Sequence, residues 1–356
     1  MGLTLINRET SPKASPSSNQ VASFRRYRYN LAALYTHRGA YSLRILITGA
    51  AGFVGSHLQH QLRSTYPDAE IHGTLFSASH QLADPAANAH VINLLDNDAV
   101  LALITRVQPD WIFHLAASAN VHKSFETPWA TLENNLRAQL NVIQGCLRAN
   151  VAPRILVISS GEVYGVEQPT DHPTREDAPL RPANPYAVSK VAQDMLALQY
   201  FLSNHLPIIR ARPFNHLGPG QALGFIAPDI ARQVAAIETG AQKPLIRCGS
   251  LTNERDFTDV RDIVHAYTLL IEHGIAGEVY NVSSGQTCTI RDLVDKILKL
   301  STIPIEIEST ANFIRSSGVS KSWGDPTRLR QATGWRQEIP LEQTLLDVLN
   351  DWRKRV

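Results

Sequence analysis

Short apolar runs that end in polar turns alternate with helical patterns along the first 212 residues of the chain. Runs of this length favour β-strands, whereas the longer segments show a helical period. We predict strands at Ile45–Thr48, Ile71–Phe76, His90–Asn93, Trp111–Leu115, Ile155–Ser159 and Pro207–Ala211, and helices at Thr131–Asn150 and Pro185–Asn204. Because strands and helices alternate, the pattern predicts an α/β fold with a doubly wound parallel sheet.

The pattern changes after residue 212, where prolines and glycines mark a long loop. Helical patterns then recur in shorter pieces, at Pro228–Thr239, Asp292–Leu300 and Leu341–Trp352. We therefore expect a sheet-forming domain at residues 43–212 and a smaller substrate-binding lobe at residues 213–356, which returns to the sheet once or twice.

A glycine-rich turn, Thr48-Gly49-Ala50-Ala51-Gly52-Phe53-Val54-Gly55, follows the first predicted strand and opens a helix. Such a turn binds a dinucleotide pyrophosphate, because backbone N–H groups and the helix N-terminus face the anion. The first domain is therefore predicted to be a Rossmann-type dinucleotide-binding domain. The second strand ends in Leu75–His80 without the acid that holds the ribose of NAD. Its serines and His80 favour NADP(H), with NAD(H) as the alternative.

Tyr186 and Lys190 are four residues apart on a predicted helix, so their side chains share one face. There we expect the ammonium to lower the tyrosine pKa from its ordinary value of ~10, which suits proton transfer near neutral pH. Ser160 and Glu162 follow a predicted strand, where polar side chains face the ligand crevice. Ser160 is a candidate donor to a substrate oxygen. Glu162 is either a general base or an exposed loop charge.

Arg212 and Arg255 lie in segments beyond the predicted sheet, and arginine binds diphosphates through two parallel hydrogen bonds. The two residues indicate a nucleotide-activated substrate. The alternative is structural pairing with Asp256 and Asp259. We expect no metal site, and we expect packed or solvated side chains at His114, His122 and His216.

The 356-residue chain has a formal net charge of +2, but six basic groups and one acid lie in its first 43 residues. The rest is slightly acidic, which argues against nucleic-acid binding. The three scattered cysteines suit a reducing cytoplasm, and no apolar run is long enough to cross a membrane. Residues 1–42 have a composition that fits an organelle transit peptide; we expect instead a disordered extension or a misplaced start.

The motifs together resemble the extended short-chain dehydrogenase/reductases that act on nucleotide sugars, over roughly residues 43–353. They are the glycine turn, His114–Ala117, Ser160 before Tyr164-Gly165, Tyr186 with Lys190, and Arg255-Asp256-Phe257. The resemblance implies cofactor contacts from Gly49, Gly52, Phe53, Val54, Gly55, Asn93, Leu94, Leu115, Ala116, Ala117, Asn135, Tyr186 and Lys190. It implies substrate contacts from Ser118, Ser160, Glu162, Asn215 and Arg255. Asn93 stands where the family has an aspartate.

Within this family, Ser160–Gly165, Asn184–Lys190 and Arg212–Gln221 are most similar to the GDP-6-deoxy-D-mannose reductases. The resemblance implies NADPH-dependent reduction of GDP-4-keto-6-deoxy-D-mannose to GDP-D-rhamnose by a cytoplasmic homodimer, paired through its two long helices. Glu162 keeps open the alternative of a GDP-mannose 4,6-dehydratase, although residues 218–221 and 228–229 lack cations usual in that family. Another nucleotide-sugar epimerase or dehydratase, and a non-enzymatic dinucleotide-binding protein, are further alternatives.

Overall fold

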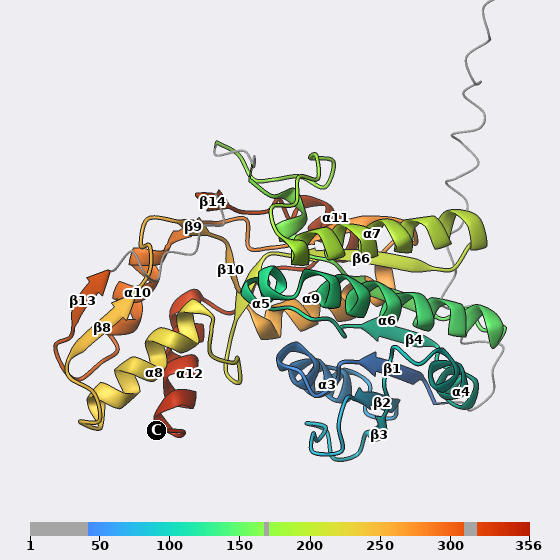
Figure 1. Cartoon of the computed structure of the whole chain (residues 1–356), viewed down its shortest axis with the longest axis horizontal. Helices are drawn as coiled ribbons and strands as arrows, with labels where there is room; N and C mark the ends of the chain where they lie inside the picture. The colour runs from blue at the N-terminus through green and yellow to red at the C-terminus, as the bar shows by residue number, and fades with distance from the viewer. Residues whose placement is uncertain (1–41, 167–170, 310–318) are drawn as a thin grey trace, which may run out of the picture. The chain divides into compact units, whose positions relative to one another are not determined.

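A parallel sheet forms the centre of the computed structural model, which describes residues 42–166, 171–309 and 319–356 (Figure 1). Within these residues the sheet has seven strands in the order β11-β6-β5-β4-β1-β2-β3. The strands are β1 (Arg44–Thr48), β2 (Glu70–Leu75), β3 (Asn88–Val91), β4 (Trp111–His114), β5 (Arg154–Ile158), β6 (Ile208–Pro213) and β11 (Val279–Val282). The predicted fold class is confirmed. The expected N-terminal extension lies outside the described residues, apart from Ser42.

The strands pair in register through their buried residues. Ile45 of β1 stands beside Ile71 of β2 on one side and Trp111 of β4 on the other. All six strands predicted from the sequence are present, with ends that differ by at most two residues. The largest difference is at β3, which starts and ends two residues before the predicted His90–Asn93.

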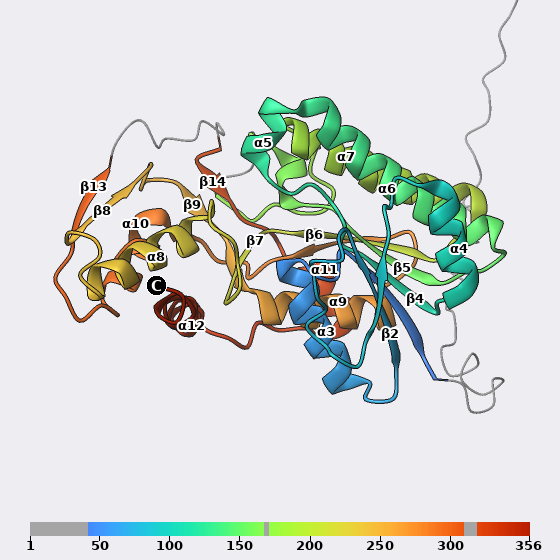
Figure 2. The ribbon, with the colours of Figure 1, turned by 60° about the horizontal axis from the view of Figure 1, so that its bottom comes forward.

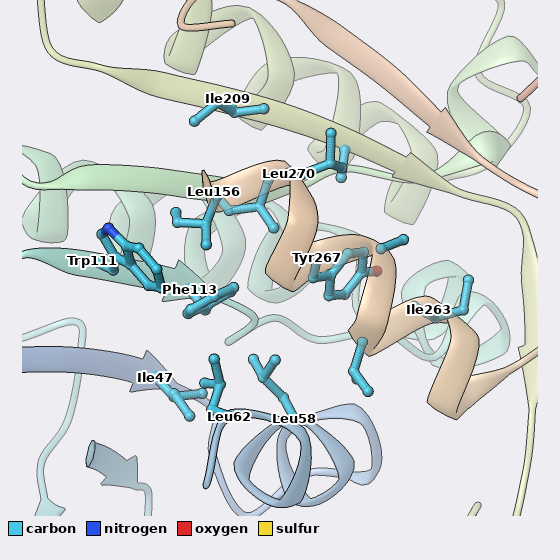
Figure 3. Packing of buried hydrophobic residues seen from close by; sticks show 14 of the residues in the cluster. Ile47, Leu58, Leu62, Trp111, Phe113, Leu156, Ile209, Ile263, Tyr267 and Leu270 are labelled. Atoms are coloured by element: carbon cyan, nitrogen blue, oxygen red, sulfur yellow. The ribbon is translucent and has the colours of Figure 1, made fainter. Parts of the chain in front are cut away.

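Helices cover both faces of the sheet (Figure 2). On one face lie α3 (Phe53–Thr65), α9 (Val260–His273) and α11 (Thr327–Thr333), whose apolar side chains join one core cluster with the sheet. Figure 3 shows this cluster, in which Tyr267 and Leu270 of α9 face Phe113 and Leu156 of the sheet. On the other face lie α4 (Asn97–Val107), α6 (Pro128–Arg148) and α7 (Pro185–Asn204), with the short helix α5 (Val121–Glu126) at their end.

The C-terminal half forms a second core of its own. Its helices are α8 (Ile226–Glu238), α10 (Ile290–Leu298) and α12 (Leu341–Arg353), beside the strand pair β8 (Leu245–Cys248) and β13 (Glu306–Ser309). Two small sheets connect it to the larger one, namely β7 (Asn215–Leu217) with β10 (Phe257–Asp259), and β9 (Glu254–Arg255) with β12 (Cys288–Thr289) and β14 (Lys321–Ser322). Strand β11 is part of the larger sheet, and helices α9 and α11 pack against that sheet, although all three follow residue 212. Among the described residues, no helix combines the length and apolar composition needed to span a bilayer.

Candidate active site

The glycine turn joins β1 to α3 at the carboxyl edge of the sheet. Gly49 has φ +71°, and a Cβ there would stand 3.0 Å from the N and Cα of Ala116. A Cβ on Gly55 would stand 2.5 Å from the carbonyl oxygens of Gly49 and Ala50. Glycine at both positions therefore lets α3 begin directly against the turn. Gly52 supplies no side-chain cap to the first N–H groups of α3, an arrangement that suits an anion such as pyrophosphate.

Two strand-end threonines hold this turn in place. Gly49 N–H donates to Thr74 Oγ1 at 3.1 Å, and Ala116 N–H donates to Thr48 Oγ1 at 3.2 Å. The same Thr48 oxygen lies 2.9 Å from His114 Nδ1. The role of both hydroxyls was missed in the sequence. The available signal was a hydroxyl at or near the end of an apolar run. They fix the backbone after β4 against the glycine turn.

Ser160, Tyr186 and Lys190 come together where β5 ends. Ser160 begins the 3₁₀ helix η2 (Gly161–Tyr164), and its Oγ accepts from Glu162 N–H at 3.2 Å. The Tyr186 hydroxyl is hydrogen-bonded to Ser160. Lys190 Nζ donates to the Ile158 carbonyl at 2.8 Å and lies 5.9 Å from the centre of the Tyr186 ring. This arrangement places a phenol, a hydroxyl and an amine around one edge of the crevice.

The pKa of Tyr186 is shifted opposite to the expected direction. Burial raises this pKa to about 12, and the hydrogen bond from Ser160 opposes that rise only in part. Burial also lowers the pKa of Lys190 to about 7, because its amine is removed from water with a carbonyl as its hydrogen-bond partner. The expected lowering of the tyrosine pKa by Lys190 is therefore wrong for the chain alone. Tyr186 is a protonated hydrogen-bond donor at neutral pH.

Glu162 lies at the same edge, held by the N-cap residue of α7. Asn184 Nδ2 donates to Glu162 Oε2 at 3.2 Å, while Asn184 Oδ1 accepts from Ala187 N–H at 2.7 Å and caps α7. The Glu162 charge raises the pKa values of Tyr186 and Arg255, the smaller effect beside burial at both groups. Glu162 therefore lies near both a proton donor and a cation.

The two candidate arginines have different environments. Arg255 donates to the carbonyls of Glu254 and Val319 at 2.7 and 2.9 Å, and so holds the segment before β14. Arg212 is buried on β6, where its Nε donates to Asp194 Oδ2 at 2.7 Å. The interpretation of Arg212 as a diphosphate ligand is therefore wrong. The structural alternative holds, with Asp194 as the partner instead of Asp256 or Asp259.

Asn135 is buried and engaged by the protein itself. Its Oδ1 accepts from Ser118 N–H at 2.7 Å, and its Nδ2 donates to Ser189 Oγ at 2.8 Å. This bonding favours a role in holding the loop after β4 to α7 over a direct cofactor contact. Ser118 itself is exposed, as is Asn215 on β7. Of the two residues expected to contact the adenine, Asn93 is exposed in a hollow beside Asp96, and Leu94 packs against the core.

Phe53 connects the glycine turn to strand β7. Its ring stacks on His216 with centroids 6.2 Å apart, and His57 meets it edge-on at 5.5 Å. His57 Nε2 also lies 2.9 Å from the Pro219 carbonyl. Burial lowers the pKa of His216, and burial together with the Lys190 charge lowers that of His114 to about 3. Both histidines are packed and neutral, and the described residues contain no cluster of metal-ligating side chains.

A Rossmann-type sheet with a glycine turn after β1, and with serine, tyrosine and lysine gathered at β5 and α7, defines a short-chain dehydrogenase/reductase. A family model described as GDP-mannose 4,6 dehydratase matches residues 46–348. The chain belongs to this family of NAD-dependent epimerases and dehydratases. Its relatives are NAD(P)-dependent reductases, dehydratases and epimerases of nucleotide sugars, and the chain is an oxidoreductase of this kind.

Known relatives span nearly the same length. GDP-6-deoxy-D-mannose reductase of Pseudomonas aeruginosa is 36% identical over 313 residues, which cover 88% of this chain and 98% of the relative. UDP-glucose 4-epimerase of Mycolicibacterium smegmatis is 30% identical over 322 residues, with 88% and 99% covered. The structure of RMD from Pseudomonas aeruginosa complexed with NADPH aligns with a TM-score of 0.77 at 36% identity, covering 88% of this chain and all of that one.

Proposed function

We propose that the protein reduces the C4 ketone of GDP-4-keto-6-deoxy-D-mannose to GDP-D-rhamnose, with NADPH as the donor. The observation that carries this proposal is the grouping of Ser160, Tyr186 and Lys190 at the carboxyl end of β5. The 36% identity to GDP-6-deoxy-D-mannose reductase supports the choice of substrate.

Each residue of the site has its own role in a carbonyl reduction. When bound, NADPH supplies the hydride that the carbonyl carbon receives. The Tyr186 hydroxyl donates its proton to the oxygen that becomes an alkoxide, which suits a phenol whose burial keeps it protonated. Ser160 hydrogen-bonds the same oxygen and holds it against Tyr186. Lys190 supplies positive charge beside the phenol when its amine is protonated, and so favours the tyrosinate that remains after proton transfer.

The cofactor choice rests on the end of β2 and on the glycine turn. The bend after β2 carries Ser77 and Ser79, whose hydroxyl oxygens lie 3.0 Å apart, and His80, with no acid to repel a 2′-phosphate. NADPH is the cofactor in the related RMD structure, which supports NADP(H) over NAD(H). We assign the pyrophosphate to the first N–H groups of α3 beside Gly49, and the adenine to the side of Asn93 and Leu94.

On the substrate side, we assign contacts to Ser118, Asn215 and Arg255, with Glu162 shaping the pocket. Asn215 and Ser118 are exposed near the site and offer hydrogen-bonding groups. Arg255 carries a half-buried cation near Glu162, which suits a diphosphate on the same side of the crevice.

Glu162 favours a second candidate function, GDP-mannose 4,6-dehydration. Its carboxylate faces the crevice beside Tyr186, where a base could remove a substrate proton. A dehydratase returns the hydride to the sugar and regenerates its cofactor, whereas a reductase consumes one NADPH per turnover. The two functions therefore differ in cofactor balance.

Two substrates offered to the same enzyme distinguish these functions. We expect the 4-keto-6-deoxy sugar to be reduced with stoichiometric oxidation of NADPH, and we expect Tyr186→Phe to lower this rate by ~10²–10⁴-fold while NADPH still binds. Conversion of GDP-mannose without net cofactor use, abolished by Glu162→Gln, would establish the dehydratase instead. Turnover of a UDP- or dTDP-sugar alone would refute the guanine assignment and keep the catalytic pair.

We further propose that the enzyme acts in the cytoplasm as a homodimer paired through α6 and α7. Val188, Met195 and Leu202 are exposed at intervals of seven residues along α7, and therefore form one apolar stripe. Trp129 is exposed at the start of the neighbouring α6. Analytical ultracentrifugation of the wild type and of Met195→Glu tests this assembly, since a charge in the stripe should produce monomers.

A further inference from the structure

A buried ion-pair network lies behind the catalytic helix. Asp194 of α7 is completely buried, and its carboxylate accepts from Arg210 Nη1 and Arg212 Nε, each at 2.7 Å. The two arginines are two residues apart on β6, so both extend to the same face of the sheet, toward α7. The network therefore ties α7 to a central strand through charge-assisted hydrogen bonds.

The network continues away from α7 through Tyr164. Arg212 Nη1 donates to the Tyr164 hydroxyl at 3.0 Å, and that hydroxyl donates to Asn281 Oδ1 at 2.6 Å. Asn281 Nδ2 then donates to the Thr174 carbonyl at 2.8 Å. Arg212 Nη1 also donates to the carbonyl of Glu176 at 3.1 Å. Arg212 thus connects α7 to the segment 174–176 by two routes, one through the Tyr164 hydroxyl and one directly to Glu176.

This segment is joined in turn to the chain after β14. Thr174 N–H donates to the Trp323 carbonyl at 3.0 Å, and Asp325 N–H donates to the Thr174 carbonyl at 2.8 Å. The residues just before β14 are those that Arg255 holds through the Val319 carbonyl. A continuous set of hydrogen bonds and backbone connections therefore leads from Asp194 to the substrate side of the crevice.

Because Asp194 lies on α7, the network also affects how Tyr186 and Lys190 are placed. Tyr186, Lys190 and Asp194 are spaced four residues apart, so they lie along one face of the helix. Fixing Asp194 against β6 therefore fixes the rotation of that face. The rotation determines where the Tyr186 hydroxyl lies relative to Ser160.

We propose that Asp194 and Tyr164 are positioning residues, which couple the substrate-side segments 174–176 and 323–325 to the place of Tyr186 in the site. Substrate bound near Arg255 then affects the position of Tyr186 through this network, in addition to contacting it across the crevice. The kinetic part of the proposal rests on the proposed function, whereas the structural coupling does not.

Tyr164→Phe tests the coupling with little disturbance of the core. The substitution removes the hydroxyl that joins Arg212 to Asn281 and keeps the ring, which stacks on Phe214 with centroids 6.0 Å apart. Tyr280→Phe is the matched control, since Tyr280 is also buried and its hydroxyl accepts one hydrogen bond, from Ile275 N–H at 2.9 Å. Asn281→Ser is a second variant, which cuts the network on the other side of the phenol.

We expect Tyr164→Phe and Asn281→Ser to lower kcat by about tenfold while the Kd of NADPH stays unchanged, because a small misplacement of a reacting group is costly. Hydrogen–deuterium exchange should be faster at residues 184–190 in both variants and unchanged in Tyr280→Phe. The proposal is overturned if both variants lose thermal stability only, as the control does, with kcat and exchange at residues 184–190 unchanged. If the wild type reduces no nucleotide sugar, the proposed function fails and the exchange data alone decide the coupling.

Discussion

Replacing Asp194 by asparagine should strongly destabilise the fold, because it removes the carboxylate that two buried arginines share. Each of its hydrogen bonds to Arg210 and Arg212 is 2.7 Å long, and both guanidinium groups are nearly inaccessible to solvent. Asparagine keeps one acceptor oxygen but turns an NH₂ group toward an arginine, so one charge-assisted hydrogen bond becomes a donor–donor contact.

The expected loss follows from these contacts. Hydrogen bonds to charged groups contribute ~1.5–3 kcal/mol each, so two of them amount to ~3–6 kcal/mol. Removing one partner of a buried ion pair typically costs ~3–5 kcal/mol, which lies within this range. We therefore expect the free energy of unfolding of Asp194→Asn to fall by ~3–5 kcal/mol.

Equilibrium unfolding in urea at pH 7 measures this loss as a lower midpoint at unchanged slope. Glu133→Gln is the control, because its 3.2 Å pair with Arg137 is solvent-exposed and should contribute less than ~0.5 kcal/mol. Asp194→Asn combined with Arg210→Gln should cost clearly less than the sum of the single substitutions, because they share one interaction. A loss below ~1 kcal/mol for Asp194→Asn would refute the reasoning, since it would mean that the arginines tolerate the missing charge.

Further predictions concern the glycine turn and Lys190. Gly55→Ala should weaken NADPH binding in calorimetric titration, because its Cβ would meet two carbonyl oxygens at 2.5 Å; Gly240→Asn, in an open left-handed position, should not. Burial lowers the Lys190 pKa in the folded state to about 7, so between pH 7 and its ordinary pKa the unfolded chain binds the extra proton. The free energy of unfolding of the wild type, relative to that of Lys190→Met, should therefore rise with pH above 7 by up to ~1.4 kcal/mol per pH unit. This gain in stability is lost as the pH falls through 7. A flat difference in urea unfolding between pH 7 and pH 9 would contradict this assignment.

Local signals in the sequence were enough for six of the seven strands of the sheet and for helix α7. Helix α7 has the predicted bounds Pro185–Asn204, because Asn184 is a strong N-cap and Pro185 fits the first turn. The glycine turn was equally readable, since its spacing is fixed by the approach of α3 to β1. Helix α9 was not predicted, although its apolar positions recur at helical spacing and the Asp259 side chain caps its first turn.

Contacts between distant elements could not be predicted in the same way. Arg212 and Asp194 are both visible in the sequence, but their pairing depends on α7 lying against β6. The pKa of Tyr186 was predicted in the wrong direction, because the spacing to Lys190 is local whereas the desolvation of both groups depends on the whole fold. The hydroxyls of Thr48 and Thr74 acquire a role only when their strands bring them to one edge.

The position of α9 along the chain matters for synthesis on the ribosome. Strands β1 to β6 are complete at Pro213, but the helix that covers Phe113 and Leu156 ends only at His273. At ~5–20 residues per second, the 60 residues between these two points take ~3–12 s to translate. During that interval the nascent sheet presents one apolar face that only α3 covers in part. The chain therefore depends on late residues to protect early ones, and a product that stops before Val260 should aggregate even though it contains Gly49, Ser160, Tyr186 and Lys190.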